Sequence, residues 1–349
     1  MSSSTSSRHG LLASQTQRAW INVAKGNPAD VLVIDEKRPI PTQLADGEVL
    51  IKVQAAALNP VPLVPELDYS GIVVDSNGTH LKDGQAVFGM IPGPPIALRS
   101  APLTGTLAQY IRVPATCAIP RPTNIKATEA AGVGACGTTA YQALFSLAKL
   151  EPGQHVFVNG GSTSVGIFAI QLAKAIGCRV TATASGKNGD FLKSIGVDKF
   201  VDYTLGPLDQ QLVKDLPSPK FHVMLEAVGN LDIDLFTQSE SYLAPGGTFV
   251  TVGPQPEGFG LNDMFALGRY GWGVAKPAWL CGASRTWRML RVEYNQEDLA
   301  AVAQYISEGK IKPIVDSVYD FDDALKAYER IMTKRAVGKV VVKIDPEAD

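Results

Sequence analysis

An apolar run enters a glycine-rich turn in the stretch Val156-Phe157-Val158-Asn159-Gly160-Gly161-Ser162-Thr163-Ser164-Val165-Gly166, and residues 167–174 continue it with helical spacing. A buried strand that enters a helix through such a turn is typical of dinucleotide-binding βαβ units. Glycine permits a tight turn and a close approach of the backbone to a ligand. The helix start would face a pyrophosphate, so the predicted phosphate-binding residues are Gly160, Gly161, Ser162, Thr163, Ser164, Val165 and Gly166. Because the spacing departs from a strict GxGxxG, the alternative is an ordinary strand-to-helix turn.

The next predicted strand ends in a segment that would select the cofactor. An NAD site has Asp or Glu there to hold the ribose 2′-OH. This chain instead continues Ser185-Gly186-Lys187-Asn188 and has no carboxylate before Asp190. Ser185 and Asn188 can donate hydrogen bonds, and Lys187 adds a positive charge suited to a 2′-phosphate. We therefore predict NADPH rather than NADH; the alternative is that Lys187 is a solvated surface residue and Asp190 caps a helix.

The pattern around this unit changes along the chain. Residues 19–121 form short β-rich runs separated by Gly, Pro and Asn-containing turns, which predicts a small barrel or sandwich. Residues 127–150 are Ala-rich with helical spacing, which predicts one helix. From residue 155 to 253, apolar strands alternate with helices, and this alternation is typical of a parallel, doubly wound sheet. The predicted fold is therefore α/β with two domains.

Composition excludes several classes of partner. The chain has 349 residues and 32 Lys+Arg against 34 Asp+Glu, a net charge of −2, so we expect no nucleic-acid partner. No apolar run reaches the roughly 20 residues that span a bilayer, so we expect a soluble protein without membrane insertion. The cysteines are far apart and form no CxxC pair, which predicts buried thiols and a cytoplasmic location; they are Cys117, Cys136, Cys178 and Cys281.

The first residues allow a second location. Residues 1–29 contain no Asp or Glu but several Ser and the basic residues Arg8, Arg18 and Lys25. That composition fits a mitochondrial transit peptide. A strand-like run begins near Arg18, however, so a short flexible tail over residues 1–17 is the preferred interpretation.

A set of motifs in fixed order identifies a family that the chain resembles. It resembles the medium-chain dehydrogenase/reductase superfamily, and within it the zinc-independent quinone oxidoreductase and enoyl reductase branch, in the style of fungal members labelled zinc-binding oxidoreductases. Beside residues 159–174, the matching stretches are 55–60 (AAALNP), 65–71 (PELDYSG), 105–110 (GTLAQY), 137–144 (GTTAYQAL), 242–247 (YLAPGG) and 337–341 (VGKVV). They cover nearly the whole chain.

The resemblance implies a GroES-like β-barrel catalytic domain that is split around an inserted Rossmann domain, with the active site in the cleft between them. The barrel would comprise residues 18–138, completed by 290–349, and residues 139–289 would bind the cofactor. Members commonly form homodimers through the edge strand of the Rossmann sheet, and a homodimer is one expectation here.

Individual site residues also follow from the resemblance. Asn59 would lie near the substrate carbonyl, and Thr139 would position the nicotinamide. Tyr203 would cover the 2′-phosphate end; its alternative is ordinary strand packing. Tyr69 is a candidate polar group in the cleft, and its alternative is an aromatic side chain of the barrel core. Two further residues, Val252 and Gly253, complete the predicted cofactor contacts.

The zinc ligands of related dehydrogenases are not matched. The zinc branch carries Gly-His-Glu where this chain has Glu66-Leu67-Asp68, and no cysteine lies near Asn59. Leu67 cannot bind a metal. We therefore expect no metal. Without a Lewis acid, nothing would stabilise the alkoxide that forms in alcohol oxidation, so we expect hydride transfer to quinones or to the C=C bond of α,β-unsaturated carbonyl compounds. The expected partner is a small electrophilic substrate.

One departure from the family concerns the segment from Asn59 to Pro65. Relatives carry an acidic residue, a helical segment and a loop there, whereas this chain runs almost directly from Asn59-Pro60-Val61 to Pro65. Three explanations are open: the substrate cleft is unusually open, the chain is a splice or gene-model variant, or the protein binds NADPH but has lost efficient turnover. Because water exclusion and substrate positioning would both suffer, we expect low activity or tolerance of bulky acceptors. Two alternatives stay open: a trans-acting enoyl reductase of a polyketide pathway, and an NADPH-binding sensor with little turnover.

Overall fold

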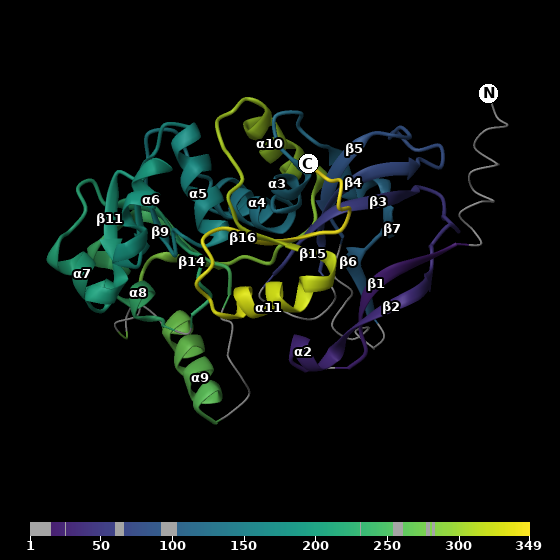
Figure 1. Cartoon of the computed structure of the whole chain (residues 1–349). Coiled ribbons are helices and arrows are strands. Elements are labelled where there is room, and N and C mark those ends of the chain that lie inside the picture. The colour runs from purple at the N-terminus through teal and green to yellow at the C-terminus, as the bar shows by residue number, and fades with distance from the viewer. Residues whose placement is uncertain are drawn as a thin grey trace. The chain divides into compact units, whose positions relative to one another are not determined.

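The computed structural model describes residues 15–24, 26–59, 66–91, 103–230, 232–253, 261–276, 280 and 283–349. The chain divides into two compact units (Figure 1). Unit 1 comprises Met1–Thr138, Glu293–Gly309 and Pro313–Asp349, and unit 2 comprises Thr139–Val292 and Lys310–Lys312.

Unit 2 is built on a parallel sheet. Its described strands follow the spatial order β11-β10-β9-β12-β13-β14, and every adjacent pair is parallel. The first strand, β9, is buried at every position, as expected for a strand covered on both faces. The predicted doubly wound sheet is confirmed. Its strands are β9 (His155–Asn159), β10 (Arg179–Ala184), β11 (Lys199–Asp202), β12 (Phe221–Glu226), β13 (Leu243–Thr251) and β14 (Thr286–Met289).

The order of these strands fixes where a ligand can bind. The chain winds outward from β9 to β11, then returns to the other side of β9 with β12. In open sheets of this kind, ligands bind at the carboxyl ends of the strands where the order reverses. In unit 2 that position lies between β9 and β12.

Helices connect the strands of unit 2 (Figure 1). The helix after β9 has eight consecutive buried residues from Gly166 to Ala173 and packs on β9 and β10. The described helices are α5 (Ser164–Ala175), α6 (Gly189–Ser194), α7 (Leu208–Lys214), α8 (Asp234–Thr237) and α9 (Leu261–Ala275), with 3-10 turns η4 (Gly186–Asn188), η5 (Tyr203–Leu205) and η6 (Ser239–Ser241).

Unit 1 is mainly β-structure. One sheet has the described order β2-β1-β6; the other has β15-β16-β3-β4-β5-β8, with β7 paired to β3. Alternating residues such as Val49, Ile51 and Val53 enter one core, which Leu107 and Val113 also line. The strands are β1 (Thr16–Asn22), β2 (Leu32–Pro39), β3 (Glu48–Ala57), β4 (Asp68–Asp75), β5 (Ala86–Met90), β6 (Leu103–Ala108), β7 (Tyr110–Pro114), β8 (Ala118–Pro120), β15 (Val315–Asp320) and β16 (Lys339–Lys343).

Short helices complete unit 1. The last of them, α11, packs on β15 and β16. Among the described residues, no helix combines the length and hydropathy needed to cross a bilayer. The helices are α2 (Pro28–Val31), α3 (Ala127–Ala131), α10 (Gln296–Ser307) and α11 (Ala324–Met332), with 3-10 turns η2 (Ala115–Cys117) and η8 (Phe321–Asp323).

The single helix predicted for residues 127–150 is wrong. The segment is divided into α3, α4 (Gly134–Tyr141) and a π-helix, η3 (Gln142–Leu147). The Asp68 carboxylate accepts a hydrogen bond of 2.6 Å from the N–H of Ala135, at the start of α4. A Cβ on Gly134 would lie 2.6 Å from the same carboxylate oxygen. A distant carboxylate therefore sets the helix start, which local spacing could not reveal.

Candidate functional site

The turn after β9 has room only for glycine at two positions. Gly160 has a φ of +83°, and a Cβ there would lie 2.6 Å from Val228. A Cβ on Gly166 would lie 2.2 Å from the carbonyl oxygen of Gly160. A side chain at either position would therefore force the turn apart. At Gly161, a Cβ would lie 3.1 Å from Ala182, which is tight but less prohibitive.

The start of α5 points its backbone donors at this turn. Thr163 caps the helix, because its hydroxyl accepts the N–H of Gly166 at 3.0 Å. The N–H groups of Ser164 and Val165 have no acceptor within the helix, as in every first helical turn. Ser162, Ser164 and Val165 are partly exposed. An anion placed here would be favoured by these donors and by the helix dipole.

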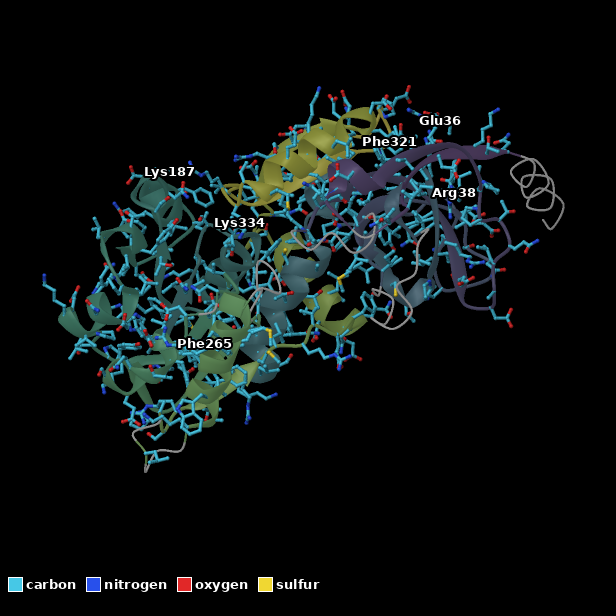
Figure 2. The ribbon with its side chains drawn as sticks, turned by 90° about the horizontal axis from the view of Figure 1, so that it is seen from below. Glu36, Arg38, Lys187, Phe265, Phe321 and Lys334 are labelled. Atoms are coloured by element: carbon cyan, nitrogen blue, oxygen red, sulfur yellow. The ribbon has the colours of Figure 1, made fainter. Side chains whose placement is uncertain are left out.

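The turn after β10 contains the three residues that were predicted to contact the adenosine half of the cofactor, Ser185, Lys187 and Asn188. Ser185 directly precedes η4, and its carbonyl accepts the N–H of Asn188 at 2.8 Å. Lys187 is exposed at the surface of unit 2 (Figure 2). Polar and cationic groups therefore follow the strand next to the glycine-rich turn.

A carboxylate that sequence reasoning missed lies beside this turn. Asp202 is paired with Ala184 between β11 and β10, and a Cβ on Gly186 would lie 2.5 Å from its Oδ2. Asp202 accepts hydrogen bonds from the hydroxyl and N–H of Thr204 and from the N–H of Gly186, which hold its pKa below the usual range. Only strand register could have revealed it, because Asp202 is distant in sequence.

Tyr203 does not belong to a strand. It begins the 3-10 turn after β11, and 52% of its surface is exposed. The strand-packing alternative is therefore not what the structure contains. Val252 and Gly253 follow β13 at the same carboxyl edge, where the N–H of Gly253 donates to the Thr251 hydroxyl at 3.0 Å.

Unit 1 contains a buried polar cluster around Lys339. The ammonium of Lys339 donates to Asp68 Oδ2 at 2.8 Å, to Asn59 Oδ1 at 2.9 Å and to the Leu58 carbonyl at 3.1 Å. Burial disfavours its charge, but Asp68 more than compensates and raises the pKa of Lys339. Its three N–H groups are therefore engaged, and the lysine is held as a cation.

Glu66 completes this cluster from an unusual backbone position. Its φ is +67°, which is uncommon for a residue other than glycine. Its carboxyl accepts hydrogen bonds from Tyr328 Oη at 2.7 Å and from Asn59 N at 2.9 Å. Burial raises the pKa of Glu66 to about 8, although Tyr328, Lys339 and Asn59 oppose the shift. Glu66 and Lys339 had no predicted role; the available signal for Lys339 was a lysine directly before the apolar run Val340-Val341-Val342.

The Asn59 amide is committed to this cluster. Its Nδ2 donates to Glu66 and to Asp68 at 3.1 Å each, while its Oδ1 accepts from Lys339. These bonds leave one lone pair of Oδ1 that can accept a further hydrogen bond. Asn59 as a whole is partly exposed to solvent.

The other predicted catalytic residues are more deeply placed. Tyr69 is fully buried in the core of unit 1, and its hydroxyl donates to the Cys117 carbonyl at 2.9 Å. Tyr69 is therefore an aromatic side chain of the barrel core, the alternative to a catalytic role, and this position leaves its hydroxyl no access to a ligand. Thr139 lies on α4 and is 6% exposed. The shortened segment from Pro60 to Pro65, residues 1–14 and Cys281 lie outside the described residues.

The chain is similar to known dehydrogenases and reductases over almost its whole length. Residues 195–342 match the zinc-binding dehydrogenase family model. A trans-enoyl reductase of Aspergillus terreus is 34% identical over 95% of this chain and 97% of its own. A chloroplastic NADPH-dependent alkenal/one oxidoreductase of Arabidopsis thaliana is 29% identical over 93% of this chain and 79% of its own. The quinone oxidoreductase structure from Coxiella burnetii is 25% identical, has a TM-score of 0.73, and is matched over 95% of this chain and all of its own.

The chain belongs to the medium-chain dehydrogenase/reductase family. It is an oxidoreductase of the enoyl reductase and quinone oxidoreductase type, with a GroES-like barrel and a Rossmann domain. This family uses a nicotinamide cofactor, and the carboxyl edge of unit 2 fits one, because its glycine positions exclude side chains and the first turn of α5 has backbone N–H groups without an acceptor in the helix.

Zinc, in contrast, does not fit the residues of unit 1. By the resemblance, Glu66-Leu67-Asp68 stands where the zinc branch has Gly-His-Glu, and the ammonium of Lys339 is bound to Asp68 and to Asn59. A lysine cation at 2.8 Å from Asp68 would repel a metal ion, and its hydrogen bond occupies a lone pair of the Asp68 carboxylate that a metal would need. Within the described part of the chain, no group of three His, Cys, Asp or Glu side chains is arranged to hold a metal.

Proposed function

We propose that the chain is an NADPH-dependent, metal-free reductase that transfers hydride to quinones or to the C=C bond of α,β-unsaturated carbonyl compounds. The observation that carries this proposal is the glycine-rich turn of unit 2, where a Cβ on Gly166 would lie 2.2 Å from the backbone. Such a turn, at the start of α5 and at the reversal of strand order, suits a dinucleotide pyrophosphate.

Domain roles follow from this assignment. Residues 139–289 would bind the cofactor, and residues 18–138 with 290–349 would bind the substrate. The pyrophosphate would contact residues 160–166, whereas Val252 and Gly253 would meet the nicotinamide half, because they follow a strand on the other side of the reversal. Thr139 would position the nicotinamide.

NADPH is preferred over NADH because of the turn after β10. Lys187 is a cation free to turn toward a 2′-phosphate, and Ser185 and Asn188 add hydrogen-bonding groups. Tyr203 is exposed beside this turn and could cover the same end. Asp202 is the opposing feature, but its oxygens are engaged by Thr204 and Gly186.

The residues of unit 1 suit activated acceptors. When bound, the cofactor supplies a hydride. The ammonium of Lys339 is bound to both Asn59 and Asp68, so these side chains would not hold a metal that polarises an ordinary carbonyl or alcohol, and an acceptor that is already electrophilic is favoured. Asn59 is partly exposed, and its amide group is held in place by Lys339 and Glu66. The amide oxygen can accept a hydrogen bond from a water or a hydroxyl, but the amide nitrogen cannot donate to a carbonyl while both of its N–H groups are engaged by Glu66 and Asp68.

Cofactor oxidation with three acceptors tests the reaction type. Purified protein is mixed with NADPH and a 2-alkenal, an ortho-quinone or a saturated aldehyde, and each reaction is repeated with NADH. We expect oxidation of NADPH with the first two acceptors, slower oxidation of NADH, and none with the saturated aldehyde. Turnover of the saturated aldehyde alone would contradict the proposal. Slow turnover would agree with the shortened segment after Asn59.

A second candidate is a trans-acting enoyl reductase that serves a polyketide synthase. It is favoured by the similarity to the Aspergillus terreus trans-enoyl reductase over 97% of that protein. Enoyl thioesters on a free acyl-carrier protein and on a small thiol distinguish the two. A preference for the carrier-bound substrate of more than about tenfold would favour the synthase partner.

A further inference from the structure

Four buried polar side chains form a hydrogen-bonded row across the sheet of unit 2. They come from four strands that are neighbours in space, and each sits at or near the carboxyl end of its strand. All four are at most 4% exposed. We name them the carboxyl-edge row: Thr183 of β10, Asn159 of β9, Glu226 of β12 and Thr251 of β13.

The links of the row are continuous. The Thr183 hydroxyl donates to Asn159 Oδ1 at 2.7 Å, and Asn159 Nδ2 donates to Glu226 Oε1 at 3.5 Å, the longest link. The Thr251 hydroxyl donates to Glu226 Oε2 at 3.1 Å. The Asn159–Glu226 link joins β9 to β12, so the row crosses the reversal of strand order.

Each end of the row is bonded to one of the two segments proposed to contact the cofactor. At one end, the Thr183 hydroxyl accepts the N–H of Gly160 at 2.9 Å, which ties the row to the glycine-rich turn. At the other end, the Thr251 hydroxyl accepts the N–H of Gly253 at 3.0 Å, which ties it to the loop after β13. Two threonine hydroxyls thus have the same role at opposite ends of the row: each accepts a hydrogen bond from a glycine N–H outside the row and donates one to the next side chain of the row.

Glu226 is the central member of the row. Besides Thr251 and Asn159, its carboxyl accepts the N–H groups of Val228 at 2.8 Å and Gly229 at 3.0 Å. Burial raises the pKa of Glu226, while these donors oppose that shift. These hydrogen bonds all come from donors, so loss of the carboxyl would leave several buried donors without an acceptor.

We propose that the carboxyl-edge row is a positioning device that holds the glycine-rich turn and the loop after β13 in register for the two halves of one dinucleotide. The inference rests on the proposed function. A positioning role differs from a merely structural one in its effect on affinity. Loss of Glu226 should weaken a ligand that contacts both ends of the carboxyl-edge row more than a ligand that contacts only the glycine-rich turn.

The experiment compares two ligands by calorimetric titration. NADPH would span both ends of the row, whereas adenosine 2′,5′-bisphosphate would touch only the side of β9 and β10. We expect Glu226→Ala to weaken NADPH binding about tenfold or more and the bisphosphate less than about threefold. Glu226→Gln keeps one carbonyl acceptor for the backbone N–H groups and can donate to Thr251, so it should restore most of the NADPH affinity.

A matched control removes a buried polar side chain at the other end of the same sheet. His155 begins β9, and its ring contacts the Pro219 carbonyl and the Thr181 hydroxyl at 2.9 and 3.0 Å. His155→Ala should destabilise unit 2 but leave the ratio of the two affinities unchanged. If Glu226→Ala does not fold, Thr251→Val removes a single hydroxyl and should weaken NADPH selectively, by about threefold.

Each outcome decides a different claim. Equal weakening of both ligands by Glu226→Ala, or weakening of neither, overturns the row as a positioning device while the proposed function stands. A wild-type protein that binds neither ligand overturns the proposed function, and the row's role in cofactor binding with it.

Discussion

The ammonium of Lys339 lies 2.8 Å from the carboxylate of Asp68, and the side chains of this pair are 3% and 0% exposed. Lys339 begins β16 and Asp68 begins β4, so the pair fixes two strands of unit 1 that are separated in sequence by most of the chain. Asp68 also accepts the N–H of Ala135 at the start of α4. One buried ion pair thus connects β4, β16 and the start of α4 in unit 1.

Removal of this ammonium should strongly destabilise the protein. Lys339→Met leaves the Asp68 carboxylate buried without its cation, and such changes cost about 3–5 kcal/mol of unfolding free energy. Lys326 is the control, because it also lies 2.8 Å from a carboxylate, that of Asp323, but is exposed. Urea denaturation should show a large loss for Lys339→Met and almost none for Lys326→Met. Similar losses for both would refute the structural role of the pair.

Glu66 should make stability depend on pH between about 4.5 and about 8. Its ordinary pKa is 4.5 and its pKa in the folded protein is about 8, so the folded state binds the proton more tightly. This stabilisation is fully present below about pH 4.5 and is lost as the pH rises through about 8. Urea midpoints measured at several pH values should fall more steeply over this range for the wild type than for Glu66→Gln.

The difference between these two proteins isolates Glu66 from other titrating groups. Burial lowers the pKa of His155, which makes stability fall as the pH drops below about 6.5, the opposite direction. That contribution is shared by the wild type and by Glu66→Gln and cancels in the comparison. Parallel pH profiles would show that Glu66 is ionised like an ordinary surface carboxyl.

Two glycines with the same backbone conformation should respond differently to alanine. Gly160 and Gly177 have φ values of +83° and +81°, so alanine strains both by about 1–2 kcal/mol. A Cβ meets Val228 at 2.6 Å in Gly160→Ala but nothing within 4 Å in Gly177→Ala. We expect NADPH binding to weaken about tenfold or more in Gly160→Ala and to change little in Gly177→Ala. Unchanged binding in both would remove the turn from the cofactor site.

Cofactor choice should depend on charges near the turn after β10. Lys187→Glu should weaken NADPH binding about tenfold or more and leave NADH nearly unchanged, because only NADPH carries the 2′-phosphate. Asp202→Asn removes a negative charge beside Gly186 and should strengthen NADPH binding by about two- to threefold. Kd values for both cofactors measure these effects. Equal losses for NADPH and NADH in Lys187→Glu would mean that Lys187 acts only structurally.

The parallel sheet and its glycine-rich turn were predictable because their signals are local. Apolar runs mark buried strands, and glycine spacing marks the turn. The break between α3 and α4 was not predictable, because Asp68, a residue of β4, accepts the N–H that begins α4. The same applies to Asp202, which strand register alone brings to Gly186. Tertiary contacts of this kind leave no periodicity in the sequence.

The catalytic assignments from resemblance were harder to place. Tyr69 occupies the barrel core because its ring fills space between strands and its hydroxyl finds a backbone acceptor. The Asn59 amide is held by Glu66, which is 7 residues away in sequence, and by Lys339, which is 280 residues away. A motif gives the type of residue at a position, whereas its free donors and acceptors depend on such neighbours.

The fate of the hydride tests the central claim most directly. NADPH that carries deuterium on the transferable C4 position is incubated with the protein and a 2-alkenal, and the product is analysed by NMR and mass spectrometry. We predict a saturated aldehyde with deuterium on the β-carbon. Deuterium on the former carbonyl carbon of an unsaturated alcohol would contradict the account, because it would show carbonyl reduction instead of C=C reduction.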